Sequence, residues 1–300
     1  MGIWIPITFG AAFFQTARTA TQQRLRAILS VSAAGFVRYA YGAPLALSAV
    51  AAMLATSRYE LPAIPTQFWF IVAAAGSAQI FGTVCLIRSF DARDFAIGTV
   101  YSKTEVVLIA LFSTVLLREP LRGPGWFGVL LCFVGVVLLA AKDGSATTIL
   151  KRFDDRSAKY AITAGALFGL AAVGIRAASK ELGGDNPAVL RALITLAVMN
   201  SMQTVLHGGY LFLREREQLV KSFRVWRSSA IVGVLSVCGS ACWAIALTLQ
   251  NAARVRTVGQ IEILFTFVVA HFWLKERHSA REYLASGLIL VAVVVVLVYG

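Results

Sequence analysis

Ten apolar runs, each close to the length that crosses a bilayer as a helix, constrain this 300-residue chain more than any single motif. A hydrocarbon core about 30 Å thick needs about 20 apolar residues in helical form. The runs cover residues 3–21, 30–54, 66–87, 95–117, 124–141, 160–180, 187–213, 228–249, 255–274 and 283–299. We therefore predict an all-α polytopic membrane protein with ten transmembrane helices. The first run is predicted to be a helix and not a secretory signal, because no basic segment precedes it.

Composition excludes two other classes of protein. Charged residues make up only 14% of the chain, whereas soluble domains contain roughly 25%, so an ordinary soluble enzyme is excluded. The formal net charge of +13 would suggest nucleic-acid binding in a polar chain. In so apolar a chain it indicates cationic loops beside a membrane, and no nucleic-acid partner is predicted. Four scattered cysteines and three histidines define no metal site or disulfide framework, so no cofactor is predicted.

The chain repeats itself at an offset of 157 residues. The matched pairs are Gly76 with Gly233, Gly82 with Gly239, Cys85 with Cys242, Glu105 with Glu262, Leu117 with Leu274, and Glu119 with Glu276. Two glutamate pairs in register are a stronger signal than glycines or leucines alone. The sequence therefore divides into a first five-helix repeat at 1–141, a charged linker loop at 142–159, and a second five-helix repeat at 160–300. Because five spans is an odd number, the second repeat is inverted in the membrane, as is typical of secondary transporters.

Lysine and arginine fall unevenly on the loops. We count Lys180 and Arg256, which stand at the ends of their runs, with the adjoining loops. Of the 28 basic residues, 17 then lie in the loops after the odd-numbered spans, six in the loops after the even-numbered spans, and five within spans. The positive-inside rule then places the odd-numbered loops in the cytoplasm and both termini outside.

Seven ionisable residues lie within the predicted spans, apart from Lys180 and Arg256 at the ends of their runs. The three deepest, Lys103, Glu105 and Glu262, would together cost about 8–10 kcal/mol if they faced lipid. We therefore expect them to face an aqueous cavity or one another. The other four are Arg18, Arg38, Arg176 and Arg191, of which Arg38 is intermediate in depth and the rest lie nearer to helix ends.

Glu105 and Glu262 are the predicted coupling residues, because they occupy matched places in the two repeats. A buried carboxylate takes up a proton near neutral pH more readily than an exposed one, which suits the exchange of a proton for substrate. The alternative is that each glutamate neutralises an intramembrane arginine and only holds helices together. The sequence favours neither reading.

Cations outnumber anions five to two within the spans, so the cavity is expected to attract an anionic or carboxylate-bearing solute. The predicted substrate-binding residues are Arg38, Tyr101, Lys103, Arg191, Trp243 and Gln260. The three cations would bind or steer the anionic group, and the other three would contact the rest of the molecule. Packing between helices is the favoured interpretation for each of five polar or aromatic residues taken singly, namely Gln79, Asn200, Gln203, Trp243 and Gln260. A packing role is likewise expected for Gly123, Gly125, Gly128 and Gly135, at and near the fifth run.

Two segments carry a family resemblance. Val115-Leu-Leu-Arg-Glu119 and Phe272-Trp-Leu-Lys-Glu276 each end a fourth span and precede a span containing glycine. With the arginine early in the second span of each half, this pattern resembles the drug/metabolite transporter superfamily of EamA type. The family often has proline in the middle of the fourth and ninth spans, where this chain has Lys103 and Glu105, and Gln260 and Glu262, respectively. The resemblance implies cytoplasmic termini, the reverse of what the loop charges indicate.

The resemblance implies an alternating-access carrier, commonly an exporter of amino acids, other metabolites or drugs. We therefore expect a secondary active transporter of a small polar, carboxylate-bearing metabolite in a bacterial inner (plasma) membrane, with protons as the coupling ion. Its partners would be the small-molecule substrate and the lipid bilayer, and no pattern in the sequence defines an oligomeric state. A flippase for a lipid or lipid-linked sugar is the alternative. An intramembrane enzyme has least support, because no span contains aspartate and no HExxH motif occurs.

Overall fold

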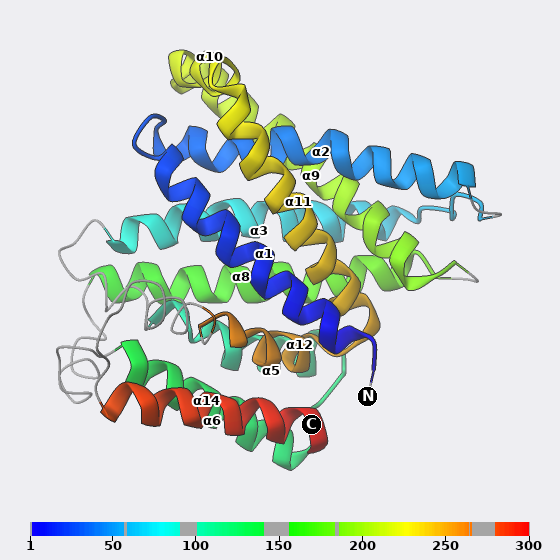
Figure 1. Ribbon diagram of the computed structural model, residues 1–300. Helices are drawn as coiled ribbons and strands as arrows, with labels where there is room; N and C mark the ends of the chain where they lie inside the picture. Colours follow the sequence, from blue (N-terminus) through cyan, green and yellow to red (C-terminus); the bar gives the residue numbers. More distant parts are fainter. Residues whose placement is uncertain are drawn as a thin grey trace. The chain divides into compact units, whose positions relative to one another are not determined.

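The computed structural model describes residues 2–56, 59–90, 101–140, 156–183, 186–263, 265 and 280–299, and every regular element in these ranges is helical (Figure 1). The α-helices are α1 (Trp4–Leu25), α2 (Val31–Thr56), α3 (Thr66–Phe90), α5 (Glu105–Leu116), α6 (Gly123–Ala140), α8 (Arg156–Glu181), α9 (Ala188–Arg214), α10 (Arg216–Arg224), α11 (Trp226–Leu249), α12 (Ala252–Gly259) and α14 (Ala280–Tyr299). The all-helical prediction is thus confirmed for the described residues.

Hydropathy located most of these helices well. Eight of the ten predicted spans coincide with a continuous helix whose ends differ by at most four residues. Five helices are long and apolar enough to cross a membrane: Val31–Thr56, Thr66–Leu86, Ala158–Glu181, Ala188–Arg214 and Trp226–Leu249. Three further apolar helices, Glu105–Leu116, Gly123–Leu138 and Tyr283–Tyr299, are shorter than the usual span. The number of ten spans therefore stays a prediction.

Two of the predicted helices are interrupted in the structure, so the prediction that they are continuous is wrong. The run at 95–117 was expected to be one helix, but residues 103 and 104 form a turn and α5 begins only at Glu105. The run at 255–274 was also expected to be continuous, but α12 ends at Gly259 and residue 260 forms a turn. Residues 95–100, 264 and 266–274 lie outside the described part of the chain. Apolar periodicity reports burial and not backbone continuity, so it misses such interruptions.

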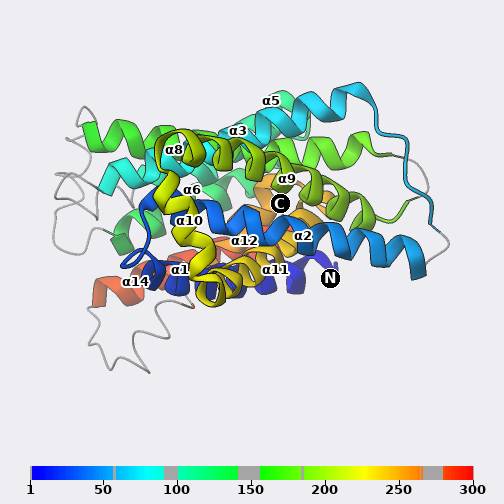
Figure 2. The same ribbon diagram turned by 90° about the horizontal axis from the view of Figure 1, so that it is seen from above.

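One compact unit comprises Met1–Ile80 and Gly174–Leu249. In it, α1 packs against α11, and α2 packs against α9 and α11. The short helix α10 contacts α2, α9 and α11 (Figure 2). Its sequence falls in the charged connection at 214–227, which hydropathy did not identify as helical.

The second compact unit comprises Phe81–Val173 and Gln250–Gly300. In it, α6 lies along α14, and α5 packs against α12. A Cβ atom added at Gly128 would lie 2.5 Å from Val296 Cγ2, and one at Gly135 would lie 2.8 Å from Ile289 Cγ1. These two glycines therefore allow α6 and α14 to approach closely, which confirms their predicted packing role. A Cβ atom at Gly123 would meet nothing within 4 Å, so the packing role predicted for Gly123 is wrong, and that of Gly125 stays a prediction.

Each compact unit combines segments from both predicted repeats. The first unit joins the start of the chain to residues 174–249, and the second joins residues 81–173 to the C-terminal segment. The repeat boundaries at 141 and 160 describe similarity within the sequence, and they stay a prediction.

Candidate functional site

The first interruption lies between Tyr101 and Glu105. The Thr104 hydroxyl donates to the Tyr101 carbonyl at 2.6 Å, and the Thr104 N–H donates to the same oxygen at 3.2 Å. The Val106 N–H donates to the Lys103 carbonyl at 3.2 Å. Hydrogen bonds of this i to i+3 type tighten the backbone, and a threonine hydroxyl that bonds to it distorts a helix. The turn therefore forms without a proline.

Helix α8 lies directly against this turn. A Cβ atom at Gly165 would lie 2.8 Å from the Ser102 carbonyl oxygen, 3.0 Å from Thr104 Oγ1 and 3.1 Å from the Glu105 nitrogen. No side chain fits in that space, so glycine is the residue that allows the two backbones to meet.

The second interruption lies at Gln260. Helix α12 starts with Asn251, whose side-chain oxygen accepts from the Ala253 N–H at 2.8 Å and from the Arg254 N–H at 3.4 Å. At its other end, the Gln260 N–H donates to the Thr257 carbonyl at 3.1 Å, and residues 261–263 are helical again. The offset of 157 residues superposes Lys103 on Gln260, so the two interruptions occupy matched positions in the repeats.

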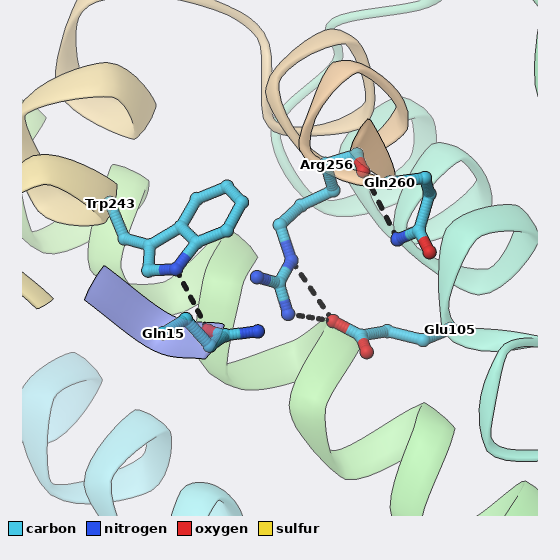
Figure 3. Close-up of polar contacts among 5 residues, drawn as sticks. All are labelled: Gln15, Glu105, Trp243, Arg256 and Gln260. Atoms are coloured by element: carbon cyan, nitrogen blue, oxygen red, sulfur yellow. Dashed lines mark hydrogen bonds and ion pairs between the residues drawn. The ribbon is translucent and has the colours of Figure 1, made fainter. Parts of the chain in front are cut away.

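Glu105 forms an ion pair with Arg256, which comes from α12 (Figure 3). Arg256 Nε donates to Glu105 Oε1 at 3.0 Å, and Arg256 Nη2 donates to the same oxygen. The side chains of Arg256 and Glu105 are only 18% and 10% exposed. Buried charges need partners because the interior does not solvate them as water does. In the structure Glu105 therefore neutralises an arginine, which is the second of the two interpretations that the sequence left open.

Gln260 follows Arg256 by four residues in the sequence and is buried. Its Nε2 donates to the Arg256 carbonyl at 3.3 Å (Figure 3). Its Oε1 is buried and has no hydrogen-bond partner among the described residues. A buried acceptor without a donor is costly, so a donor from outside the chain would be stabilised at this atom.

Three other predicted residues belong to the same compact unit. Tyr101 is buried in an apolar cluster with Ala158 and Ala161. Lys103 is half-buried in the turn before α5, and Glu262 is half-buried in the helical residues after Gln260. The second compact unit thus contains six residues of interest, namely Tyr101, Lys103, Glu105, Arg256, Gln260 and Glu262.

The remaining predicted residues belong to the first compact unit. Trp243 is buried, and its Nε1 donates to Gln15 Oε1 at 2.9 Å (Figure 3). Arg38 lies half-buried on α2 with its guanidinium carbon 5.4 Å from the centroid of the Tyr39 ring. Arg191 lies near the start of α9 and donates from Nη1 to the Ser179 carbonyl at 3.4 Å. The Nε atoms of Arg38 and Arg191 are buried without a hydrogen-bond partner among the described residues.

Two further polar residues have structural roles. Arg176 is 8% exposed, and its Nη1 donates to the carbonyls of Leu247 at 2.6 Å and Thr248 at 3.3 Å, at the C-terminus of α11. Gln203 donates from Nε2 to the Gly76 carbonyl at 3.1 Å and to Gln79 Oε1 at 2.8 Å. The expected packing role of Gln79 and Gln203 is therefore confirmed.

Arg256 is the site residue that the sequence did not reveal. It stands at the edge of the run at 255–274, next to Arg254, and was therefore counted as a loop residue. The one signal for it was that Glu105 needed a cation. No spacing rule connects two residues that are 151 positions apart.

Apolar helices of spanning length, helices interrupted at matched positions and buried polar side chains together define a polytopic membrane protein of the transporter class. The model of the EamA-like transporter family matches residues 2–141 and 156–298. The chain therefore belongs to the EamA-like transporter family, within the drug/metabolite transporter superfamily, and carries two copies of its repeat.

Comparison with solved structures gives the fold independently. A structure titled "Crystal structure of protein" is similar with a TM-score of 0.72 and 15% sequence identity, over 98% of this chain and 96% of the other. At this identity the likeness concerns the fold alone. A search of curated proteins gave no match.

Proposed function

We propose that this transporter moves a small polar, carboxylate-bearing metabolite, such as an amino acid or a derivative, by alternating access. Its direction would be outward across a bacterial inner (plasma) membrane, in exchange for protons. The observation that carries the proposal is the buried Glu105–Arg256 ion pair beside two interrupted helices. Interrupted helices at matched places in two repeats are typical of the substrate and ion sites of secondary transporters.

The ion pair suits an exchange of partners. Arg256 stays charged at all physiological pH values, so while buried it needs an anion at all times. A substrate carboxylate can take the place of Glu105 on the guanidinium, and the displaced Glu105 carboxylate then needs another cation, a role that Lys103 in the adjoining turn would fill. When the substrate leaves, the ionised Glu105 pairs with Arg256 again. No proton leaves with the substrate in this exchange of partners.

A second carboxylate allows proton and substrate to move in opposite directions. Glu262 lies after the second interruption, in the place that matches Glu105. An inward proton on Glu262 would accompany the return of the empty carrier, while Glu105 and Arg256 handle the outgoing substrate. Lys103, Arg38 and Arg191 would draw the anionic solute towards the site.

The unpartnered oxygen of Gln260 supports an amino-acid-like substrate. Gln260 Oε1 is a buried acceptor on the residue whose Nε2 bonds to the Arg256 backbone. A ligand with a carboxylate for Arg256 and an N–H donor for Gln260 would satisfy both groups. A carboxylate without such a donor would leave the Gln260 oxygen unpaired, so the pair of groups favours an amino group near the carboxylate.

Transport by the full chain in proteoliposomes tests the proposal, with substrates identified by comparing extracellular metabolites of cells that overexpress the protein and cells that lack it. In Glu105→Gln, substrate accumulation driven by a pH gradient should fall at least about tenfold, while exchange of labelled for unlabelled substrate continues. Glu262→Gln should also alter the pH dependence. Glu181→Gln, at the half-buried last residue of α8, is the matched control. Unchanged pH profiles in both site variants would leave the carboxylates as structural residues and overturn the coupling.

A further inference from the structure

The short helix α10 has an unusual place in the chain. It is preceded directly by the candidate span Ala188–Arg214 and followed directly by the candidate span Trp226–Leu249. A segment between two spans that enter and leave the same bilayer lies at one membrane surface. The position of α10 at the membrane–water boundary follows from this connectivity alone.

The rest of its unit holds α10 in place. The Ser30 N–H donates to Gln218 Oε1 at 2.9 Å, and the Ser30 hydroxyl donates to Glu215 Oε2. Leu219 and Val225 pack against the apolar cluster that contains Leu25, Leu29, Ala33, Ala34, Phe36, Val37, Leu211 and Val232. These contacts tie α10 to the turn between α1 and α2. The segment therefore presents a fixed surface.

Three apolar side chains of this segment are exposed. Val220 is 52% exposed, Phe223 is 51% exposed and Trp226 is 58% exposed. Exposed aromatic and aliphatic side chains beside a membrane surface fit the boundary between headgroups and acyl chains, where one side of a short helix becomes buried.

Basic side chains surround these apolar residues. Residues 214–227 contain five basic and two acidic side chains, a net charge of +3. We call the five basic residues the α10 basic patch; all are exposed, and they are Arg214, Arg216, Lys221, Arg224 and Arg227. Arg24, in the last turn of α1, and Arg26, directly after α1, are also exposed. Two patch members lie against aromatic rings, with Arg216 5.3 Å from the Phe212 centroid and Arg227 5.7 Å from the Trp226 centroid.

We propose that α10 and its basic patch bind the headgroups of anionic phospholipids in the leaflet at which α10 lies. The exposed apolar residues would enter the boundary region, and the patch would contact phosphate groups. Charge complementarity selects anionic over zwitterionic lipid, because each basic side chain near an anionic surface strengthens binding about fivefold. This lipid site is independent of the substrate and of the proton, and it does not depend on the proposed transport mechanism.

Native mass spectrometry of the full chain in mild detergent, with equal amounts of phosphatidylglycerol and phosphatidylcholine, tests the proposal. The wild type should retain phosphatidylglycerol preferentially. The variant Arg216→Gln/Lys221→Gln/Arg224→Gln should lose at least about tenfold of this preference. The control variant Arg122→Gln/Arg156→Gln/Lys159→Gln removes the same charge from other exposed positions and should keep the preference.

Three results would overturn the lipid site. They are equal loss of preference in the two triple variants, no loss in either of them, and displacement of the lipid by inorganic phosphate at constant ionic strength. If the α10 triple variant does not fold, the test uses the wild type and Val220→Ser instead. The lipid preference of the wild type should fall when salt rises from about 50 mM to about 500 mM, because screening weakens exposed charges. Val220→Ser should fold and bind phosphatidylglycerol more weakly. A lipid preference that changes neither with salt nor in Val220→Ser would refute the site.

Discussion

Removal of one partner from the Glu105–Arg256 pair should destabilise the protein strongly. In Glu105→Gln, the guanidinium of Arg256 keeps its charge and loses its anion, while its side chain stays 18% exposed. Breaking a buried ion pair in this way costs about 3–5 kcal/mol. Because neither side chain is completely buried, we expect about 3 kcal/mol, the lower end of that range.

This loss of unfolding free energy corresponds to a measurable shift in the unfolding midpoint, Tm. For a chain of this size, 1 kcal/mol corresponds to about 2–4 °C in the unfolding midpoint. Glu105→Gln and Arg256→Gln should therefore each lower Tm by about 6–12 °C, measured on the full chain in mild detergent. Arg122→Gln, which removes an exposed charge, should leave Tm nearly unchanged.

The double variant Glu105→Gln/Arg256→Gln decides whether the pair is the cause. Two neutral amides can hydrogen-bond to each other, so the double variant should lose about 2–3 kcal/mol less than the sum of the two single variants. Strictly additive losses would refute the reasoning, because they would show that each residue stabilises the protein through other contacts.

Three further predictions concern the backbone and the orientation. Gly165→Ala should lower Tm, because the new Cβ atom would lie 2.8 Å from the Ser102 carbonyl oxygen; we expect a loss of about 1–3 kcal/mol in unfolding free energy. Gly123→Ala should leave Tm unchanged, because a Cβ atom there would have nothing within 4 Å. Arg118 has a φ of 54°, so Arg118→Gly should be neutral or stabilising by up to about 1 kcal/mol and Arg118→Val destabilising in the same thermal assay. A cysteine at exposed position Glu217, in a chain otherwise free of cysteine, should react with an impermeant maleimide only in permeabilised cells; reaction in intact cells would reverse the orientation.

The helices were predictable because burial in a bilayer requires long apolar runs. The limits of α2, α9 and α11 follow from hydropathy to within two residues. The two interruptions were not predictable in the same way. In the first, the decisive contacts are the Thr104 hydroxyl on the Tyr101 carbonyl and the approach of Gly165, and both depend on tertiary structure. Hydropathy cannot detect a threonine that bonds to its own backbone.

The candidate site was predictable only in part, for a similar reason. The cost of a charge in a bilayer singled out Lys103, Glu105 and Glu262. It could not identify the partner of Glu105, because Arg256 adjoins a loop and its partner lies in the other repeat. It also treated Arg176 as a helix-end residue, whereas that guanidinium is buried on the carbonyls of Leu247 and Thr248. Backbone carbonyls can satisfy a buried arginine, and sequence alone does not show where a helix end will supply them.

The position of Arg256 also changes the argument about orientation. The loops after even-numbered spans were assigned six basic residues, among them Arg254 and Arg256. Both belong to α12, where Arg256 pairs with Glu105 and Arg254 Nη2 donates to the Leu297 carbonyl at 3.4 Å. The positive-inside rule applies to loop residues that remain beside the membrane, and not to charges satisfied inside the protein. Without these two arginines, 17 basic residues on the odd-numbered loops face four on the even-numbered loops. The charge asymmetry that favours external termini therefore becomes stronger. That orientation would place α10 with its basic patch on the cytoplasmic side, where anionic lipids of the kind that we propose it binds give the leaflet its negative surface potential.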